Sequence, residues 1–324
     1  MRTKKILYLG MKYDYGNAMR GWSFEEKNFH DPLRRYTGVA VRHFDFMALS
    51  QKHGVARMSE MLVQTVQKEK PDLLFGVFFD EPADPSKEAM NYITNHTDTI
   101  TCLWMCDDHW RFEKYSQHWA PHVRYIVTTA AGALLKYHAL GMGHKVIKSQ
   151  YACNHHMYFP HDAPQDLEVT FVGQPHSNRQ EIIEYLKRAN LRLNVYGWGW
   201  KEYPRIPFYE MVRLFSRSAV NLNLSNASAN SSQQIKGRNF EIPGCRAFLL
   251  TGPAENMEEY YEPEKEIVIF NDSPEMVEKI RYYLAHEDER RRIAARSYQR
   301  TLSEHTWKHR FYVIFKQMGF TANA

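Results

Sequence analysis

The sequence predicts an α/β protein with two domains, each an open, doubly wound parallel sheet covered by helices. Three observations support this fold class. Strand-like and helix-like segments alternate along all 324 residues. Most strand-like segments lack an alternation of apolar and polar residues, as in DLLFGVFF (residues 72–79), which is typical of parallel strands buried on both faces. The alternation stops at a polar, proline-containing stretch near residues 151–166 and then restarts, and this length suits two domains.

The first half contains four helix-like and six strand-like segments. Ser23 and Glu26 have the spacing of a capping box, which marks a helix start. The segment 56–70 repeats apolar residues at helical spacing on one face. We expect strands at residues 4–10, 41–46, 72–79, 99–106, 124–129 and 144–150, and helices at 23–38, 56–70, 86–96 and 130–140.

The second half repeats the pattern. The stretch QQIKGRNFEIPGCRAFLLT (residues 233–251) predicts a short helix over 235–242, a turn at Pro243-Gly244 and a buried strand. We expect strands at residues 167–173, 191–197, 219–225, 247–251 and 266–271, helices at 178–190 and 207–218, and one long helical tail at 273–319.

Composition excludes several classes of protein. Hydrophobic residues make up 44% and charged residues 24%, and no apolar run approaches the length of about 20 residues that spans a bilayer. The four cysteines lack the spacing of a disulfide framework, which predicts reduced thiols in a cytoplasmic protein. The net charge of +5 suits anionic ligands such as phosphates. The basic run at residues 288–300 is either a solvated helix face or a contact for an anionic polymer or membrane.

Open parallel sheets bind ligands beyond the carboxyl ends of their strands, so the loops there are the candidate sites. The loop after the first strand is long, polar and aromatic, and is either substrate-binding or an ordinary surface loop. Its glycines, Gly10, Gly16 and Gly21, are too widely spaced for a dinucleotide fingerprint, which argues against a nicotinamide dehydrogenase. The candidate substrate-binding residues in it are Tyr13, Asp14, Asn17, Arg20 and Trp22.

Two carboxylates follow the predicted strand 99–106. Asp107 and Asp108 are candidates for a base that accepts a proton from a hydroxyl nucleophile, or for helix caps. We expect no metal site, because neither this run nor Cys153 with its neighbouring histidines provides a complete set of ligands.

The loops of the second half carry cations and small polar residues. A helix start near Ser177 and Arg179 favours phosphate. Lys236 and Arg238 are candidates for a pyrophosphate, and Glu241 for the two hydroxyls of a ribose, or for a surface pair with Arg238 worth about 0.2–0.5 kcal/mol. The full set of candidate nucleotide-binding residues is Gly173, Ser177, Arg179, Tyr196, Gly197, Asn223, Ser225, Lys236, Arg238 and Glu241.

The second half resembles the donor-binding half of a GT-B glycosyltransferase, and is most similar to the CgeB-like family. The resemblance rests on VTFVGQPHSNRQEIIEYL, VYGWGW, SAVNLNLS and KGRNFEIPGCRAFLLT, and on the run from residue 266 to 311. LWMCDDHWRF and residues 127–146 extend it, more loosely, into the first half. It implies an acceptor domain at residues 1–163, a donor domain at 164–308 and a C-terminal helix at 309–324 that crosses back to the first domain.

The resemblance implies a nucleotide-sugar donor, carrying UDP, GDP or a similar nucleotide, and no metal requirement. By similarity, Arg238 would bind the diphosphate and Glu241 the ribose. The family tends towards Asp-Asp-Pro where this chain has Asp107-Asp108-His109, so His109 is a further candidate acid or base. For a transferase, Asp108 is our candidate for the residue nearest the acceptor hydroxyl. Many retaining relatives carry two glutamates spaced E-x7-E, but the earlier position here is Gln233, so no stereochemical course is assigned. The acceptor stays open among glycan, protein, lipid, small molecule and, less favoured, DNA. The alternatives are a non-catalytic nucleotide or sugar binder, and a sugar-nucleotide epimerase or hydrolase.

Overall fold

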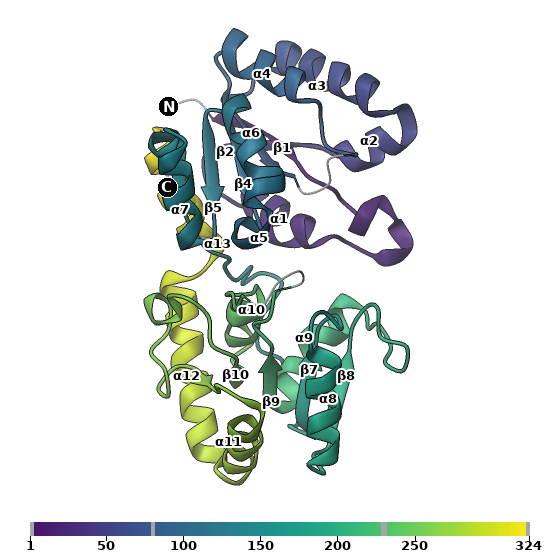
Figure 1. Cartoon of the computed structure of the whole chain (residues 1–324), viewed down its shortest axis with the longest axis vertical. Helices are drawn as coiled ribbons and strands as arrows, with labels where there is room; N and C mark the ends of the chain where they lie inside the picture. The colour runs from purple at the N-terminus through teal and green to yellow at the C-terminus, as the bar shows by residue number, and fades with distance from the viewer. Residues whose placement is uncertain (1–2, 79–81, 228–231, 322–324) are drawn as a thin grey trace. The chain divides into compact units, whose positions relative to one another are not determined.

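The computed structural model describes residues 3–78, 82–227 and 232–321, and the chain divides into two compact units. The first unit joins Met1–Gln150 to Trp307–Ala324, and the second is Tyr151–Thr306 (Figure 1). The boundaries in the structure thus follow residues 150 and 306, whereas the boundaries expected from the sequence follow residues 163 and 308. Phe79, the last residue of an expected strand, lies outside the described residues, as do residues 228–231.

The first unit contains a six-stranded, all-parallel sheet in the order β2-β1-β3-β4-β5-β6. β1 pairs with β2 on one side and β3 on the other, so the direction of winding changes at β1 and β3. This switch point is where open sheets of this kind bind ligands. The strands are β1 (Lys4–Leu9), β2 (Val39–Phe44), β3 (Leu73–Val77), β4 (Ile100–Met105), β5 (Tyr125–Thr128) and β6 (Val146–Lys148).

Helices connect these strands, and two expectations for them need correction. The predicted helix at 23–38 is partly a π-helix, η3 (Glu26–His30), followed by a short α1 (Asp31–Arg34). Ser23 Oγ accepts from the Glu26 N–H at 2.8 Å, which confirms the predicted cap. The sequence did not predict α2 or the turns from Asp108 to His122. The longer helices are α2 (Phe46–His53), α3 (Val55–Glu69), α4 (Lys87–His96) and α7 (Ala131–Ala139); the shorter α5 (Asp108–Arg111), η4 (Phe112–Ser116), α6 (Gln117–Trp119) and η5 (Ala120–His122) precede β5.

The last helix, α13 (Trp307–Gln317), packs on the first unit. The Trp307 ring lies 4.5 Å from that of Phe29 and 5.5 Å from that of Trp104, and its Nε1 donates to Asn28 Oδ1 at 3.2 Å. Because these aromatic side chains are buried, α13 completes the core of a sheet formed from the other end of the chain.

The second unit contains a five-stranded, all-parallel sheet in the order β11-β10-β9-β7-β8. The chain winds from β7 to β8 in one direction and from β9 to β11 in the other, so the switch point lies at the carboxyl ends of β7 and β9. The strands are β7 (Leu167–Val172), β8 (Leu193–Tyr196), β9 (Ser218–Asn223), β10 (Leu249–Thr251) and β11 (Val268–Ile269).

The helices of this unit follow the predicted order until the tail, but α10 begins at Arg238, three residues later than predicted, and it contains Pro243 and Gly244, where a turn was expected. The expected single helix at 273–319 is three helices, with breaks at His286 and at residues 305–306. At the second break the His305 carbonyl accepts from the Cys153 N–H at 2.9 Å. The helices are α8 (Arg179–Arg188), α9 (Phe208–Arg217), α10 (Arg238–Gly244), α11 (Ser273–Ala285) and α12 (Glu287–Glu304).

Both units are therefore parallel-sheet α/β structures, and the predicted fold class is confirmed. In the described part of the chain, no helix has the length and apolar character needed to cross a lipid bilayer.

Candidate functional site

Arg179 lies at the switch point of the second sheet. It begins α8, and its side chain is only 7% exposed. Its Nη1 donates to the Gln174 carbonyl at 3.1 Å, in the loop after β7. Its Nη2 donates to the carbonyls of Leu224 (2.7 Å) and Asn226 (3.2 Å), in the loop after β9. One guanidinium therefore joins the two loops that border the ligand position of a doubly wound sheet.

Arg238 forms a buried ion pair with Glu241 three residues later. Glu241 Oε2 accepts from Arg238 Nη1, and the Arg238 Nη2 contacts the Met211 sulfur at 3.0 Å. The Arg238 side chain is 25% exposed, whereas that of Glu241 is completely enclosed. The pair is thus not the surface pair considered from the sequence. Glu241 Oε1 is buried and has no hydrogen-bond partner among the described residues.

The two arginines influence each other. Burial, together with the nearby Arg238 guanidinium, lowers the pKa of Arg179 to about 10. Two like charges near each other in a poorly solvated position repel, and an anion bound beside them relieves that repulsion. Because Glu241 is the carboxylate paired with this cluster, its net charge is positive. The geometry and charge suit a phosphate group.

Asn223 and Ser225 are engaged with the protein itself. Asn223 Nδ2 donates to Thr251 Oγ1 (2.9 Å) and to Asn239 Oδ1 (3.2 Å), and Ser225 Oγ donates to the Gly252 carbonyl (2.8 Å). Asn239 Oδ1 also accepts from the Lys236 N–H at 2.8 Å. This network ties the ends of β9 and β10 to the segment that begins α10, so it positions Arg238.

Gly173 and Gly197 allow the ends of β7 and β8 to approach closely. A Cβ on Gly197 would lie 2.0 Å from the Gly173 carbonyl oxygen, and Gly197 has φ of +151°. That oxygen also accepts from Trp200 Nε1 at 2.7 Å. Gly197 therefore has a structural reason to be glycine, whatever it contacts in a complex.

The remaining candidates of the second unit differ in exposure. Ser177 is exposed with φ of +54°, just before α8, and Tyr196 and Lys236 are half-buried. Gln233 is exposed and forms an isolated antiparallel bridge with Asn226. The loop residue Asn226 is thus connected both to Arg179 and to the stretch that leads to Arg238.

Asp108, the candidate residue nearest the acceptor, is fully buried in the first unit. Its Oδ2 accepts from the Tyr137 hydroxyl at 3.1 Å. Burial raises the pKa of Asp108 to about 6, and hydrogen bonds from Ser116, Thr128 and Tyr137 partly offset that rise. A pKa near 6 suits a base, but the enclosed carboxylate has no contact surface for a substrate in this structure.

Asp107 is the more accessible of the two carboxylates. It is half-buried at the N-cap of α5, and its side chain makes no capping hydrogen bond; its backbone carbonyl accepts from the N–H of Trp110 and Arg111 instead. The capping alternative therefore does not hold for its carboxylate. His109 follows in α5 and is also half-buried.

The loop after β1 is closed on itself and displays aromatic groups. Tyr13 and Trp22 form an antiparallel bridge across its base. Arg20 Nε lies 2.8 Å from Asp14 Oδ2, and the Asn17 side chain accepts from the Met19 N–H. Trp22 is 51% exposed and Tyr15 50%. The five candidates thus belong to one ordered loop at the carboxyl end of β1.

The sequence analysis missed the residues that position the others. Thr251, Asn239 and Tyr137 were not singled out, although Thr251 ends β10 and Asn239 follows Arg238 directly. The basic run at 288–300 lies on α12. Arg290 in it is buried and donates to the Tyr283 carbonyl, whereas Arg291 and Arg300 pair with Glu287 and Glu304. These contacts with the protein itself favour the helix-face alternative over a contact for an anionic polymer or membrane.

The fold and this edge of the second sheet define a class of protein. Two doubly wound parallel sheets in one chain, with the last helix returning to the first unit, make up the GT-B architecture. Residues 178–316 match the profile of a family described as glycosyl transferase-like. The matched range includes Arg179, Arg238 and Glu241.

Known proteins are similar to this chain in sequence or in structure. The chain is 23% identical over 211 residues to spore protein CgeB of Bacillus subtilis; the match covers 56% of this chain and 64% of that protein. Anabaena HepE in complex with UDP has a similar structure (TM-score 0.67, 12% identity, 98% of this chain and 100% of that one). So does sucrose-phosphate synthase of Thermosynechococcus elongatus (TM-score 0.64, 9% identity, 98% and 97%). The resemblance predicted from the sequence is confirmed.

Proposed function

We propose that the protein is a glycosyltransferase that takes a sugar from a nucleotide-sugar donor, with UDP the first candidate nucleotide, and transfers it to an acceptor hydroxyl. The observation that carries the proposal is the pair of guanidiniums, Arg179 and Arg238, at the switch-point edge of the second sheet. The glycosyl transferase-like profile over residues 178–316 and the GT-B fold support it, as does HepE, which was crystallised with UDP.

In this proposal the second unit binds the donor. Arg238 contacts the diphosphate, while Arg179 holds the two loops in place and adds positive charge. Glu241 Oε1, which has no hydrogen-bond partner in the described part of the chain, would accept from a ribose hydroxyl once the ligand displaces part of the enclosing surface, because buried acceptors are normally satisfied. Lys236, Ser177, Tyr196 and the glycine pair border the same edge. No residue of this set requires a metal, since the cations themselves neutralise the leaving charge.

The first unit would bind the acceptor through Tyr13, Asp14, Asn17, Arg20 and Trp22. In the reaction, the acceptor oxygen bonds to the anomeric carbon, and the bond from that carbon to the diphosphate breaks. The nucleoside diphosphate leaves with the electron pair, and a carboxylate takes the acceptor proton. We propose Asp107 as the group that touches the acceptor and Asp108 as the buried partner beside it, since only Asp107 has an accessible carboxylate. His109 is a second acid or base candidate.

The acceptor hydroxyl in this proposal belongs to a glycan, protein, lipid or small molecule, with DNA less favoured. A reaction in the cytoplasm accords with the four free cysteines. A non-catalytic binder on the same scaffold would hold the nucleotide without turnover, and an epimerase or hydrolase would consume the donor without an acceptor.

The test begins with calorimetric titration of UDP, GDP and their sugar conjugates into the purified chain. We expect one nucleotide to bind with a 1:1 stoichiometry. The bound conjugate is then incubated with pools of glycan, lipid and small-molecule acceptors, and products are identified by mass spectrometry. Donor binding without any release of nucleoside diphosphate would contradict the enzyme proposal and favour the binder, whereas release without an acceptor would favour the hydrolase.

A further inference from the structure

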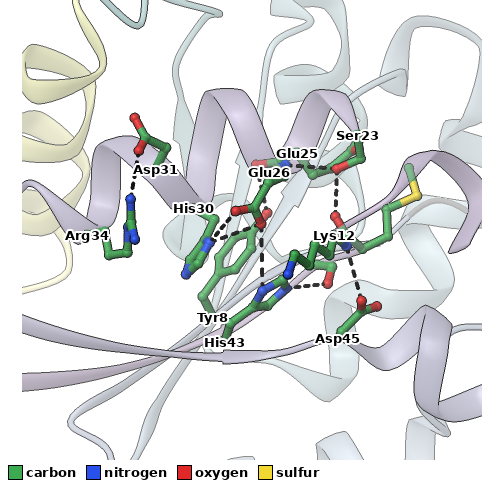
Figure 2. Close-up of polar contacts among 12 residues, drawn as sticks. Tyr8, Lys12, Ser23, Glu25, Glu26, His30, Asp31, Arg34, His43 and Asp45 are labelled. Carbon is green, nitrogen blue, oxygen red and sulfur yellow. Dashed lines mark hydrogen bonds and ion pairs between the residues drawn. The ribbon is translucent and has the colours of Figure 1, made fainter. Parts of the chain in front are cut away.

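Three potential metal ligands converge on one point in the first unit. Glu26 and His30 come from the π-helix η3, and His43 comes from β2 (Figure 2). His30 Nδ1 lies 2.9 Å and 3.0 Å from the two Glu26 carboxylate oxygens, and His43 Nδ1 lies 3.6 Å from Glu26 Oε2. Among the described residues, this is the group of three such side chains whose ligand atoms lie within 4.8 Å of one another.

The hydrogen bond on the far side of His43 sets the orientation of its ring. His43 Nε2 lies 2.8 Å from the carbonyl oxygen of Gly10. Since a carbonyl only accepts, Nε2 carries the proton, and in the neutral ring Nδ1 presents a lone pair to the Glu26 carboxylate. Two acceptors then face each other across 3.6 Å, and a cation between them would satisfy both. A backbone carbonyl behind a ligating histidine is also the usual outer partner of metal sites.

Packing keeps the two imidazoles close to each other. Their centroids are 4.4 Å apart, and the Tyr8 ring stacks on His30 at 5.4 Å with an interplanar angle of 14°. Tyr8 is anchored in turn by its hydroxyl, which donates to the Glu25 carbonyl at 3.2 Å. In Figure 2 dashed lines join the Glu26 carboxylate to the His30 ring, which comes from the same helix, and to the His43 ring of β2. The site is therefore organised before any ion binds, which lowers the cost of binding.

The ligand set selects the kind of ion. Two imidazoles and one carboxylate are found in zinc sites, whereas Mg²⁺ and Ca²⁺ prefer oxygen ligands alone. Ligands at about 2.0–2.1 Å from a tetrahedral zinc are about 3.3 Å from one another. The separations of 2.9 Å (His30 to Glu26) and 3.6 Å (His43 to Glu26) in the structure bracket that value. The three side chains are 12–16% exposed, so water reaches the cluster.

We propose that Glu26, His30 and His43 bind one divalent transition-metal ion, Zn²⁺ in the first instance, with a fourth position open to water. The ion would join η3 to β2 at the carboxyl end of β1, because Gly10, which contacts His43, begins the loop that displays Tyr13 and Trp22. This site is in the first unit and is separate from the arginines proposed to bind the diphosphate. It does not depend on the proposed function.

The experiment uses the full chain without a histidine tag, stripped with a chelator and then dialysed. Zn²⁺ binding is followed by calorimetry, and the bound metal is measured by elemental analysis. Co²⁺ then replaces Zn²⁺, because tetrahedral Co²⁺ with nitrogen and oxygen ligands absorbs in the visible range without the intense near-ultraviolet band of thiolate ligation. We expect one equivalent of metal and the visible bands, with a higher melting temperature in the metal-loaded protein.

The variants Glu26→Gln, His30→Gln and His43→Gln each remove one ligand. We expect at least a 10-fold weaker affinity and loss of the visible bands in each. His96→Gln, at an exposed histidine of α4, is the matched control and keeps both. Circular dichroism verifies that each variant is folded, and Glu26→Gln preserves shape best. Absence of binding in the folded parent chain would overturn the proposal, as would equal binding by the three variants and a thiolate band in the Co²⁺ spectrum.

Discussion

The Arg179 guanidinium donates to the main-chain oxygen of Leu224 at 2.7 Å. This bond joins the loop after β9 to the start of α8, and a second bond to Gln174 joins the loop after β7. Among the described residues, this buried cation therefore donates to backbone oxygens and to no carboxylate. Carbonyl groups do not neutralise the positive charge of Arg179. This charge lies at the edge of the second sheet at which we propose that an anionic ligand binds.

Replacement of Arg179 by lysine should therefore lower both stability and nucleotide affinity. Lysine keeps the charge but cannot donate to three carbonyls with one planar group, and each lost hydrogen bond to a charged group is worth about 1.5–3 kcal/mol. We expect a loss of about 3 kcal/mol in the free energy of unfolding, measured by urea denaturation. Arg188→Lys, at the exposed end of the same helix, is the control and should change neither quantity. Unchanged stability of Arg179→Lys would show that the loops do not depend on this side chain.

The pairing role of Arg238 can be separated from its role as a ligand. Arg238→Met alone leaves Glu241 buried and unpaired, which costs about 3–5 kcal/mol of stability. The double variant Arg238→Met with Glu241→Gln removes both charges and should recover most of that loss. If Arg238 binds the diphosphate, calorimetry will show about 10-fold to 100-fold weaker UDP affinity in both variants. Recovery of affinity along with stability would mean that Arg238 only supports the fold.

The sequence was sufficient to predict the fold because strand-like and helix-like segments alternate and because strands such as β3 are apolar on both faces. It also pointed to Arg179, Arg238 and Glu241, since charged residues beside parallel-strand ends are conspicuous. It could not show that Arg179 is held by the Leu224 carbonyl, because a main-chain acceptor has no sequence signature. The burial of Asp108 depends on Tyr137, 29 residues away, and the approach of Glu26 to His43 depends on how η3 packs over β1 and β2.

The close approach of Gly197 to Gly173 predicts a strong effect of one methyl group. In Gly197→Ala the new Cβ would lie 2.0 Å from a backbone oxygen at a φ that alanine rarely adopts, so the strands must shift. We expect a loss of about 3 kcal/mol or more in the free energy of unfolding. Gly132→Ala in α7, where a Cβ would meet nothing within 4 Å, should instead stabilise by about 0.5–1 kcal/mol. Similar effects of both substitutions in urea melts would refute the steric argument.

The two neighbouring aspartates should respond differently in a transfer assay. Asp107→Asn removes the accessible carboxylate, and we expect kcat to fall by about 100-fold or more while donor affinity is kept. Asp108→Asn keeps an acceptor for the Tyr137 hydroxyl and should lower kcat less, because the buried group acts through its surroundings. Full activity in Asp107→Asn would exclude it as the base and return that role to Asp108 or His109.

Asp108 should also leave a mark on the pH dependence of stability. Its pKa of about 6 in the fold lies above the ordinary value of 3.8, so between these values the folded chain holds a proton that the unfolded chain has lost. The free energy of unfolding must then fall as pH rises from about 4 to about 6, and this contribution is constant above that range. A shift of this size corresponds to about 3 kcal/mol. Asp108→Asn does not titrate, so the wild type minus variant difference, measured by urea melts at half-unit steps of pH, should decrease over that interval and then level off. A difference that is flat from pH 4 to 8 would show that burial does not raise the pKa of this carboxyl.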